Sequence, residues 1–441
     1  MKRPNIIFIV ADDLGFADLG CYGGRDAHFG PVSPVLDRLA ANGLCLSDGY
    51  SNSPVCSPTR FALMTARYQY RLRAAAEEPI NSKSKGSTVL GLAPEHPSLP
   101  SLLKASGYRT ALIGKWHLGY PPAFSPLKSG YESFFGPMAG GVDYFSHCSG
   151  NGTHDLYLGE EEHTEEGYIT DLLSKRAVDY VENMGAAAAK DMPFFLSLHY
   201  TAPHWPWETR QDHALSAEVR ENLFHLHGGN IHTYQRMIHH MDEGIGWIVQ
   251  ALEKTGQLDN TLIVFTSDNG GERFSDNWPL VGGKMDLTEG GIRVPWIAHW
   301  PAVIAPGGWS PQHCMTMDWS ATLLDLAGAK PDPQYPLDGV SLANVLRVAN
   351  HQFERPLFWR MNHRGQRAFR DGDWKYLRVD GNDYLFNIAV DARERANLGG
   401  RQPERLHAMR QAWENWNDTM PPIPKDATIN LGFSVKDMPQ R

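Results

Sequence analysis

Short apolar runs alternate with helical patterns along the first three quarters of the chain. Five runs rich in β-branched and aromatic residues predict buried strands. Between them, apolar residues recur at three- and four-residue spacing, which predicts helices packed on a sheet. This alternation is typical of an α/β domain with a largely parallel sheet. The predicted strands are 5–10, 110–114, 194–199, 262–266 and 296–299, and the predicted helices include 34–41, 59–65, 98–106, 168–183, 229–253 and 319–327.

The last quarter of the chain has a different pattern. A proline-rich stretch at 331–336 predicts a boundary, so we expect a large N-terminal domain over 1–335 and a smaller α+β domain over 336–441. Short alternating runs joined by Asp-Gly turns predict an antiparallel sheet there. The predicted strands are 357–360, 367–370, 375–379 and 383–386, and a helix is predicted over 401–417.

An extended tail is predicted from about residue 421. Its apolar residues alternate with polar ones, which fits pairing with a sheet edge or a partner chain, and equally an ordered surface tail. The partner-chain interpretation makes a homo-oligomer a hypothesis. The alternating residues are Ile429, Leu431, Phe433 and Val435.

Composition excludes several classes of protein. With 41 basic and 50 acidic residues among 441, the formal charge is −9, which argues against non-specific nucleic-acid or polybasic membrane binding. Five cysteines form no disulfide framework, and those other than Cys56 are interpreted as structural or incidental. No apolar run approaches the roughly 20 residues of a membrane span, and none resembles a signal peptide. We therefore expect a cytoplasmic protein, or a periplasmic or secreted one if a leader has been removed.

Two predicted strands end in pairs of oxygen-bearing side chains. Asp12 and Asp13 follow the first strand, and Asp268 and Asn269 follow the fourth. Ligands of open α/β sheets bind at the carboxyl ends of the strands. Three carboxylates and an amide form a hard oxygen set that suits Ca²⁺ or Mg²⁺. Either pair alone also fits a solvated turn.

Cys56 lies at the predicted start of a helix, with Arg60 one turn further along. The helix dipole favours negative charge at that end. Cys56 therefore fits a thiolate nucleophile with a lowered pKa, and it also fits a structural cysteine that caps the helix.

Further cationic and titratable residues follow strands or lie in glycine-rich loops. Lys115 and His117 point to one side of an extended segment, a pairing that suits an anionic substrate and proton transfer. His204 lies between tryptophans in a proline-stiffened loop, and Lys284 follows two glycines that permit close approach to an anion. A solvated strand end, a packed loop and a surface lysine are the respective structural alternatives.

Together these motifs resemble the formylglycine-dependent (type I) sulfatases of the alkaline phosphatase superfamily, and in particular arylsulfatases and N-acetylgalactosamine sulfatases. Cys56-Ser57-Pro58-Thr59-Arg60 matches the Cys-x-Pro-x-Arg signature of that family. Residues 5–13, 107–119, 258–271, 289–295 and 370–376 resemble further family motifs in family order. The resemblance covers about residues 4–400.

The resemblance implies a fold, an activity and two cofactors. The fold is alkaline-phosphatase-like, a mixed and largely parallel sheet between helices with a smaller C-terminal domain. The activity is hydrolysis of aryl or carbohydrate sulfate esters. Its nucleophile is a formylglycine hydrate, made from Cys56 by a formylglycine-generating enzyme, and its intermediate a covalent sulfo-enzyme. Asp12, Asp13, Cys56, Asp268 and Asn269 are the implied ligands of Ca²⁺, with Mg²⁺ the alternative.

Roles for the other residues follow from the same resemblance. Arg60 and Lys115 orient the hydrate, and Lys284 binds the sulfuryl oxygens. His204 is the candidate acid for the leaving alcohol, and His117 the candidate base that expels sulfate. On the substrate side, Ser146 or His147 would contact the sulfate or sugar, and Trp205 and Trp207 would stack on a ring or, equally, belong to the core.

Two other functions share these motifs. Related members of the superfamily hydrolyse phosphonate monoesters or phosphodiesters, which also present a tetrahedral anion. A non-catalytic protein that binds sulfated ligands is the alternative if Cys56 stays a thiol. The family signature usually continues Thr-Gly-Arg, whereas this chain has Ala66 at the glycine position, which costs little if that backbone is helical.

Overall fold

A ten-stranded mixed sheet forms the centre of the computed structural model, which describes residues 2–185, 192–219, 222–226 and 228–430. Strand β1 (Asn5–Ala11) lies between β8 (Phe194–His199) and β9 (Thr261–Ser267), and both neighbours run parallel to it. The prediction of a largely parallel α/β sheet is confirmed. The order is β11-β2-β10-β9-β1-β8-β4-β5-β6-β7, where the remaining strands are β2 (Leu44–Leu46), β4 (Arg109–Gly114), β5 (Ser133–Gly136), β6 (Tyr157–Leu158), β7 (Glu161–Glu162), β10 (Trp296–His299) and β11 (Gly308–Ser310).

The register brings the carboxyl ends of four strands to one edge. Val10 of β1 pairs with His199 of β8, and Ala11 pairs with Ser267 of β9. Gly114 of β4 also pairs with His199. The residues that follow these strands therefore meet at a single place above the sheet.

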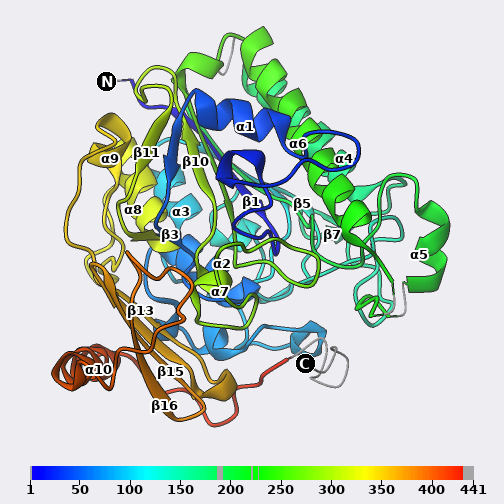
Figure 1. Ribbon diagram of the computed structural model, residues 1–441. Helices are drawn as coiled ribbons and strands as arrows, with labels where there is room; N and C mark the ends of the chain where they lie inside the picture. The colour runs from blue at the N-terminus through cyan, green and yellow to red at the C-terminus, as the bar shows by residue number, and fades with distance from the viewer. Residues whose placement is uncertain (1, 186–191, 220–221, 227, 431–441) are drawn as a thin grey trace.

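Helices cover both faces of the sheet (Figure 1). Alternate residues of β1 face opposite layers, as the two-residue period of a strand requires. Ile7 and Ile9 pack with α1, α4 and α6, whereas Ile6 and Phe8 pack with α2, α3, α8 and α9. The bounds are α1 (Pro34–Ala41), α2 (Cys56–Thr65), α3 (Leu99–Ala105), α4 (Ile169–Gly185), α6 (Ile231–Lys254), α8 (Thr316–Ala327) and α9 (Ala343–Arg347), with the short α5 (His213–Val219) and α7 (Glu289–Ile292) outside these layers.

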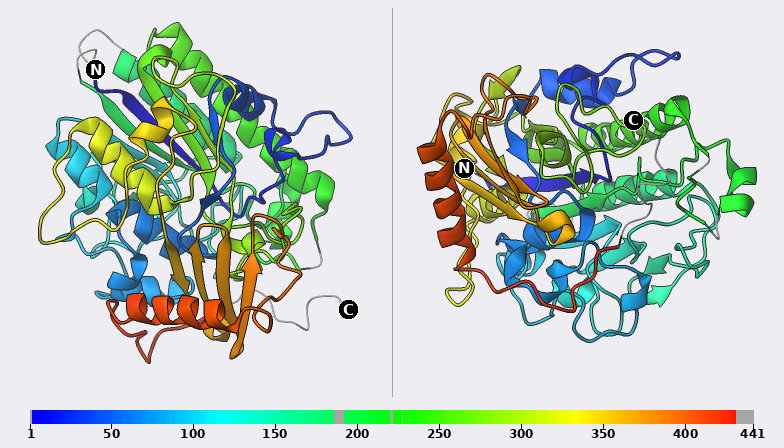
Figure 2. Two further views of the ribbon diagram at one scale, coloured as in Figure 1. Left: turned by 60° about the vertical axis from the view of Figure 1, so that its left-hand side comes forward. Right: turned by 60° about the horizontal axis from the view of Figure 1, so that its bottom comes forward.

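A second, antiparallel sheet lies in the last quarter of the chain, as predicted. One face packs on α10 (Pro403–Asn417) (Figure 2). The other face joins the core beside α2, where Trp359 donates to the Ser51 carbonyl at 2.9 Å. The boundary near residue 335 stays a prediction. The strands are β13 (Leu357–Arg360), β14 (Arg367–Asp371), β15 (Trp374–Val379) and β16 (Asn382–Asn387), and two short strands, β3 (Gly49–Tyr50) and β12 (Cys314–Met315), pair separately.

The tail after α10 returns to the first half of the chain (Figure 1). Ile429 forms a parallel bridge with Glu78, so the described part of the tail pairs within its own chain. Leu431, Phe433 and Val435 lie outside the described residues.

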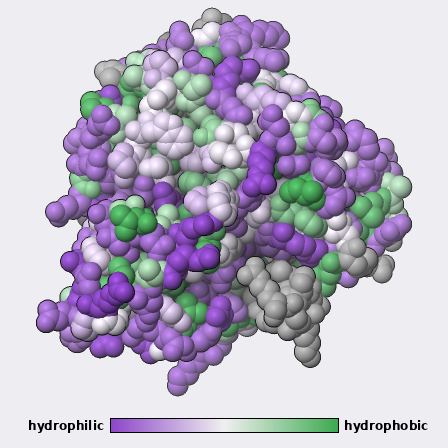
Figure 3. Space-filling model, in the orientation of Figure 1, coloured by the Kyte–Doolittle hydropathy of each residue, from purple (hydrophilic) through white to green (hydrophobic). Residues whose placement is uncertain are grey.

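The face of the molecule in Figure 3 is hydrophilic over most of its area, with hydrophobic residues in small separate groups. Among the described helices, none is long and apolar enough to cross a membrane.

Candidate active site

Carboxylates from two neighbouring strands meet at the edge of the sheet. Asp12 and Asp13 follow β1, and the Asp13 amide donates to Asp268 Oδ1 after β9 at 3.3 Å. Asn269 Nδ2 donates to Asp13 Oδ1 at 2.7 Å. Ligand atoms of Asp12, Asp13 and Cys56 all lie within 4.8 Å of one another. The structure thus brings together the five residues predicted to hold a metal ion.

Two oxygen atoms of this cluster suit a cation. Asp12 Oδ1 and Asn269 Oδ1 are buried and lack a hydrogen-bond partner among the described residues. A buried acceptor without a donor is costly unless something else binds it. Because the donors are hard oxygens, the site fits Ca²⁺ or Mg²⁺ better than zinc or copper.

Three cations, of which Arg60 and Lys115 are buried and Lys284 is partly buried, offset the carboxylates. Arg60 Nη2 and Nε donate to Asp268 Oδ2 at 2.8 and 3.1 Å. Lys115 Nζ contacts Asp12 Oδ2 at 2.6 Å, and Lys284 Nζ contacts Asp13 Oδ2 at 2.6 Å. Burial and the nearby Asp268 nevertheless raise the pKa of Asp12 well above its usual range. A cation beside Asp12 would favour its ionised form.

Cys56 begins helix α2 at the floor of the site and is only 2% exposed. Burial raises the pKa of its thiol to about 12, although Lys115 and Lys284 act in the opposite direction. The interpretation of Cys56 as a thiolate with a lowered pKa is therefore wrong, because desolvation outweighs the neighbouring charges. The unmodified residue is a neutral thiol at pH 7.

His117 and His204 face the site from two loops. His117 Nε2 donates to the Ile80 carbonyl at 2.7 Å, and its buried Nδ1 lacks a hydrogen-bond partner among the described residues. His204 Nδ1 donates to the Trp205 carbonyl at 2.6 Å, and its Nε2 lies 3.6 Å from Asp13 Oδ2. Burial and the neighbouring lysines lower the pKa of both imidazoles well below the usual value. Each ring is neutral in this arrangement, with one nitrogen free to accept a proton.

His199 belongs to the same cluster and was not predicted. It ends β8, and its Nδ1 lies 3.2 Å from Arg60 Nη1 and 3.2 Å from the Lys115 carbonyl. The sequence feature that could have identified His199 is its position at the end of a predicted strand, which lies beside β1. Burial followed by the charge of Arg60 lowers its pKa to about 3, so His199 supports Arg60 as a neutral group.

A cavity of about 490 Å³ opens above Cys56. Its size is in the ordinary range of ligand pockets, about 300–1,000 Å³. Trp205 lines it, with its ring centroid 4.7 Å from that of Phe224. Other lining residues are His117, His204, Lys284, Glu272, Asn81, Lys83, Gly140, Gly141, Ser149, Ile429 and Asn430.

Three residues predicted on the substrate side do not line this cavity. Trp207 is buried and packs edge-on against Phe274, with centroids 4.7 Å apart. His147 is buried and its Nε2 contacts the Gly167 carbonyl at 3.1 Å. Ser146 caps a turn, its amide donating to Asp143 Oδ1 at 2.6 Å. Substrate contact by these three finds no support in the geometry, whereas Trp205 is placed for it.

The prediction that alanine in place of glycine costs little at position 66 required a helical backbone there. The backbone of Ala66 is not helical. It ends α2 in the left-handed region, with φ 53° and ψ 27°. Its amide donates to the Ala62 carbonyl at 2.9 Å, which closes the helix. Glycine adopts this conformation without strain, and alanine does not.

The fold and the site together define a class of enzyme, and the comparisons agree. The sequence model of the Sulfatase family matches residues 4–329. This chain belongs to the sulfatase family, the type I sulfatases of the alkaline phosphatase superfamily, and is a sulfuric ester hydrolase. A metal ion and formylglycine are general features of that family.

The chain is similar in sequence and in structure to particular sulfatases. The chain is 33% identical to N-acetylgalactosamine-6-sulfatase of Rattus norvegicus over 378 residues, covering 81% of this chain and 68% of the relative. It is 30% identical to human arylsulfatase A, covering 93% and 87%. Among solved structures it resembles Ps i-CgsB in complex with k-i-k-neocarrahexaose, with a TM-score of 0.83 and 34% identity, covering 94% and 93%.

Proposed function

We propose that this sulfatase removes sulfate from a saccharide, with Cys56 as the precursor of its nucleophile. The observation that carries the proposal is the placement of Cys56. It lies among three carboxylates, two lysines and two histidines at the floor of an aromatic-lined cavity. Relatives named for an amino-sugar sulfate and a structure solved with an oligosaccharide support a saccharide substrate.

The proposed metal is Ca²⁺, held by Asp12, Asp13, Asp268 and Asn269 and by the oxygen that replaces the Cys56 sulfur. A bound cation would polarise the sulfate ester and offset charge that develops on its oxygens. Carboxylate and amide oxygens are the ligands that Ca²⁺ takes, with Mg²⁺ the alternative.

Cys56 is proposed to be oxidised to formylglycine by a formylglycine-generating enzyme during maturation. The hydrate of that aldehyde would supply the attacking oxygen, which the neutral thiol of Cys56 does not. Arg60 acts through Asp268, whose orientation it holds with two hydrogen bonds.

The side chains around Cys56 then have separate tasks. Lys115 contacts Asp12 and Lys284 contacts Asp13, and both charges act on Cys56, so these lysines would bind sulfuryl oxygens beside it. His117 has its free Nδ1 available to accept a proton, as a base requires. For His204 to act as acid, its Nε2 must first gain a proton, and the anionic substrate would favour that charge.

Aromatic residues at the cavity mouth support a ring-shaped substrate. Trp205 and Phe224 form a tilted pair beside His204, and Phe224 is 36% exposed. Such a surface packs against the apolar face of a sugar ring while its hydroxyls reach polar groups. The cellular location and the oligomeric state stay predictions.

The test uses the full chain co-expressed with a formylglycine-generating enzyme. Peptide mass spectrometry should find sulfur and two hydrogens at Cys56 replaced by one oxygen. The modified protein should hydrolyse 4-nitrophenyl sulfate faster than the corresponding phosphonate monoester and phosphodiester, and should release sulfate from N-acetylgalactosamine 6-sulfate or neocarrahexaose. Cys56→Ala should be inactive.

Two results would contradict the proposal. An unmodified thiol at Cys56 in protein that still turns over sulfate would exclude the formylglycine nucleophile. Modified protein that releases sulfate from aryl esters alone would exclude the saccharide substrate.

A further inference from the structure

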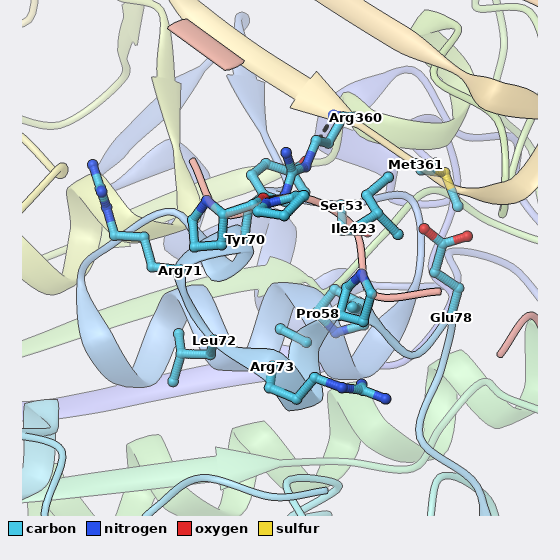
Figure 4. A pocket seen from close by; sticks show the side chains of 15 residues that line it. Ser53, Pro58, Tyr70, Arg71, Leu72, Arg73, Glu78, Arg360, Met361 and Ile423 are labelled. Carbon is cyan, nitrogen blue, oxygen red and sulfur yellow. Dashed lines mark hydrogen bonds between the residues drawn. The ribbon is translucent and has the colours of Figure 1, made fainter. Parts of the chain in front are cut away.

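The tail after α10 is anchored along its course to the first half of the chain. Arg360 Nη2 donates to the Pro421 carbonyl at 2.6 Å, at the edge of a cavity of about 270 Å³ beneath the tail (Figure 4). Arg73 Nη2 contacts Asp426 Oδ2 at 2.9 Å. The tail is therefore held at its start and near its middle by arginines from two different parts of the fold.

Backbone pairing then fixes the last described residues. The Glu78 amide donates to the Thr428 carbonyl at 3.0 Å, and the Asn430 amide donates to the Glu78 carbonyl at 2.8 Å. Asn430 Nδ2 donates to the Pro79 carbonyl at 2.8 Å. The next residue, Ile80, has the carbonyl that receives the His117 hydrogen bond. Asn430 is thus positioned by the same segment that positions His117.

Asn430 marks the junction of two cavities. On one side it lines the cavity above Cys56, and on the other a second cavity of about 420 Å³. Both cavities also share three residues from the segment that the tail pairs with, namely Ile80, Asn81 and Lys83. The two cavities therefore adjoin at these shared residues, beside the place that a substrate over Cys56 would occupy.

Of the two cations that line the second cavity, Arg73 and Lys83, only Arg73 is paired with a carboxylate of the described residues. Arg73 is paired with Glu77 at 2.7 Å and with Asp426. Lys83 is exposed, and its Nζ forms no ion pair or hydrogen bond within the described parts of the chain. Asn81 holds the backbone beside it, with Oδ1 accepting from the Lys83 amide at 2.9 Å. Lys83 is therefore available to an anionic group at the junction.

We propose that Asn81, Lys83 and Asn430 form a second saccharide subsite, which binds an anionic sugar unit next to the one that loses sulfate. This inference rests on the proposed function and names its substrate class as sulfated oligosaccharides of at least two units. Lys83 pairs with a sulfate of the neighbouring unit, and the two amides bond its hydroxyls. Aryl sulfates and single sugars reach only the cavity above Cys56.

The test compares Lys83→Ala with the parent enzyme on three substrates: 4-nitrophenyl sulfate, a sulfated monosaccharide, and a multiply sulfated oligosaccharide such as neocarrahexaose. Because exposed ion pairs are weak, we expect kcat/KM on the oligosaccharide to fall about three- to fivefold, with the two small substrates unchanged. Lys83→Arg should retain the parent rate. Lys330→Ala, which removes an exposed lysine far along the chain, is the matched control.

Salt provides an independent readout. Raising the ionic strength shortens the Debye length from about 10 Å at 0.1 M to about 3 Å at 1 M. The preference of the parent enzyme for the oligosaccharide should therefore shrink with salt, and that of Lys83→Ala should change much less.

The outcomes separate the two proposals. Equal effects of Lys83→Ala on all three substrates, or none on the oligosaccharide, would overturn the subsite. So would a parent enzyme that prefers single sugars. Protein with formylglycine at residue 56 that releases no sulfate from any saccharide would instead contradict the proposed function.

Discussion

Ala66 is a residue whose backbone conformation conflicts with its side chain. At φ 53° its Cβ approaches the following carbonyl, a conflict that costs an L-residue about 1–2 kcal/mol. The carbonyl of Ala66 also accepts the amides of Asp338 and Gly339, at 3.1 and 3.0 Å. The end of α2 thus binds the backbone of residues 338 and 339 despite this strain.

We expect Ala66→Gly to stabilise the protein. Relief of strain at positive φ outweighs the greater entropy of glycine in the unfolded chain, so the free energy of unfolding should rise by about 0.5–1 kcal/mol. Denaturant titration measures it. Ala62→Gly, within the same helix, should destabilise by a similar amount. A loss of stability on Ala66→Gly would show that the left-handed conformation is wrong.

Glu208 makes stability depend on pH. It is fully buried beside Asp143, and burial followed by that carboxylate raises its pKa to about 9. The folded protein keeps this proton between about pH 4.5 and 9, whereas the unfolded chain releases it. Stability from this group is therefore complete below the unfolded pKa and is lost as pH rises through the folded one.

Glu208→Gln should remove this dependence. Relative to the parent, its free energy of unfolding should increase by up to about 1.4 kcal/mol per pH unit across that window. Urea titrations at a series of pH values provide the measurement, with exposed Glu404→Gln as control. A constant difference between Glu208→Gln and the parent would refute a raised pKa at this position.

Residues that follow the predicted strands were predictable, and those placed by long-range packing were not. Asp12 and Asp268 could be assigned to one site because carboxyl ends of parallel strands converge. Trp207 lies two residues from Trp205, yet only Trp205 reaches the cavity. Sequence cannot say which ring of a loop packs inward, since that depends on a partner 67 positions away, Phe274.

At the scale of elements, the loop after β5 places two glycines against His117 and His204, the two histidines proposed to act in catalysis. A Cβ on Gly140 would lie 2.5 Å from His117 Cε1, and one on Gly141 would lie 3.0 Å from His204 Cε1. The two histidine rings are therefore held by the backbone of this loop and by their hydrogen bonds to the Ile80 and Trp205 carbonyls.

Gly140→Ala should displace the His117 ring and break its bond to Ile80. Because small misplacements of catalytic groups are costly, kcat should fall about ten- to hundredfold with little change in unfolding temperature. Gly150→Ala is the matched control, since it lines the same cavity and its Cβ would meet no atom within 4 Å. Equal kcat for both variants would argue against a positioning role for the loop.

Element positions were predicted better than the contacts between elements. The predicted helix 34–41 coincides with α1, and the predicted strand 194–199 coincides with β8. The local pattern sufficed for these, because α1 buries one face and β8 is a short apolar run that is buried on both faces. The alternation in the tail indicates that it pairs, but it does not identify the partner, because Glu78 lies some 350 residues away in the sequence.

At the scale of the whole molecule, the proposed metal should couple the site to stability. Four of its proposed ligands directly follow β1 and β9, so a bound cation would link the ends of two central strands. Adding Ca²⁺ to chelator-treated protein should raise the unfolding temperature, with about 2.7 kcal/mol of stabilisation at a hundredfold excess over the dissociation constant. Asp12→Asn should respond less. An unfolding temperature indifferent to Ca²⁺ in the parent would count against the assignment.

Burial of Cys56 also has a consequence for the order of events in biosynthesis. All ten residues of α2 are buried, and the Cys56 side chain is 2% exposed. Once the protein has folded, α2 is buried and another enzyme cannot bind it. The strand that completes the pocket, β9, is translated some 200 residues after Cys56. The proposed oxidation of Cys56 would therefore have to precede folding, and a chain that folds first would keep its thiol.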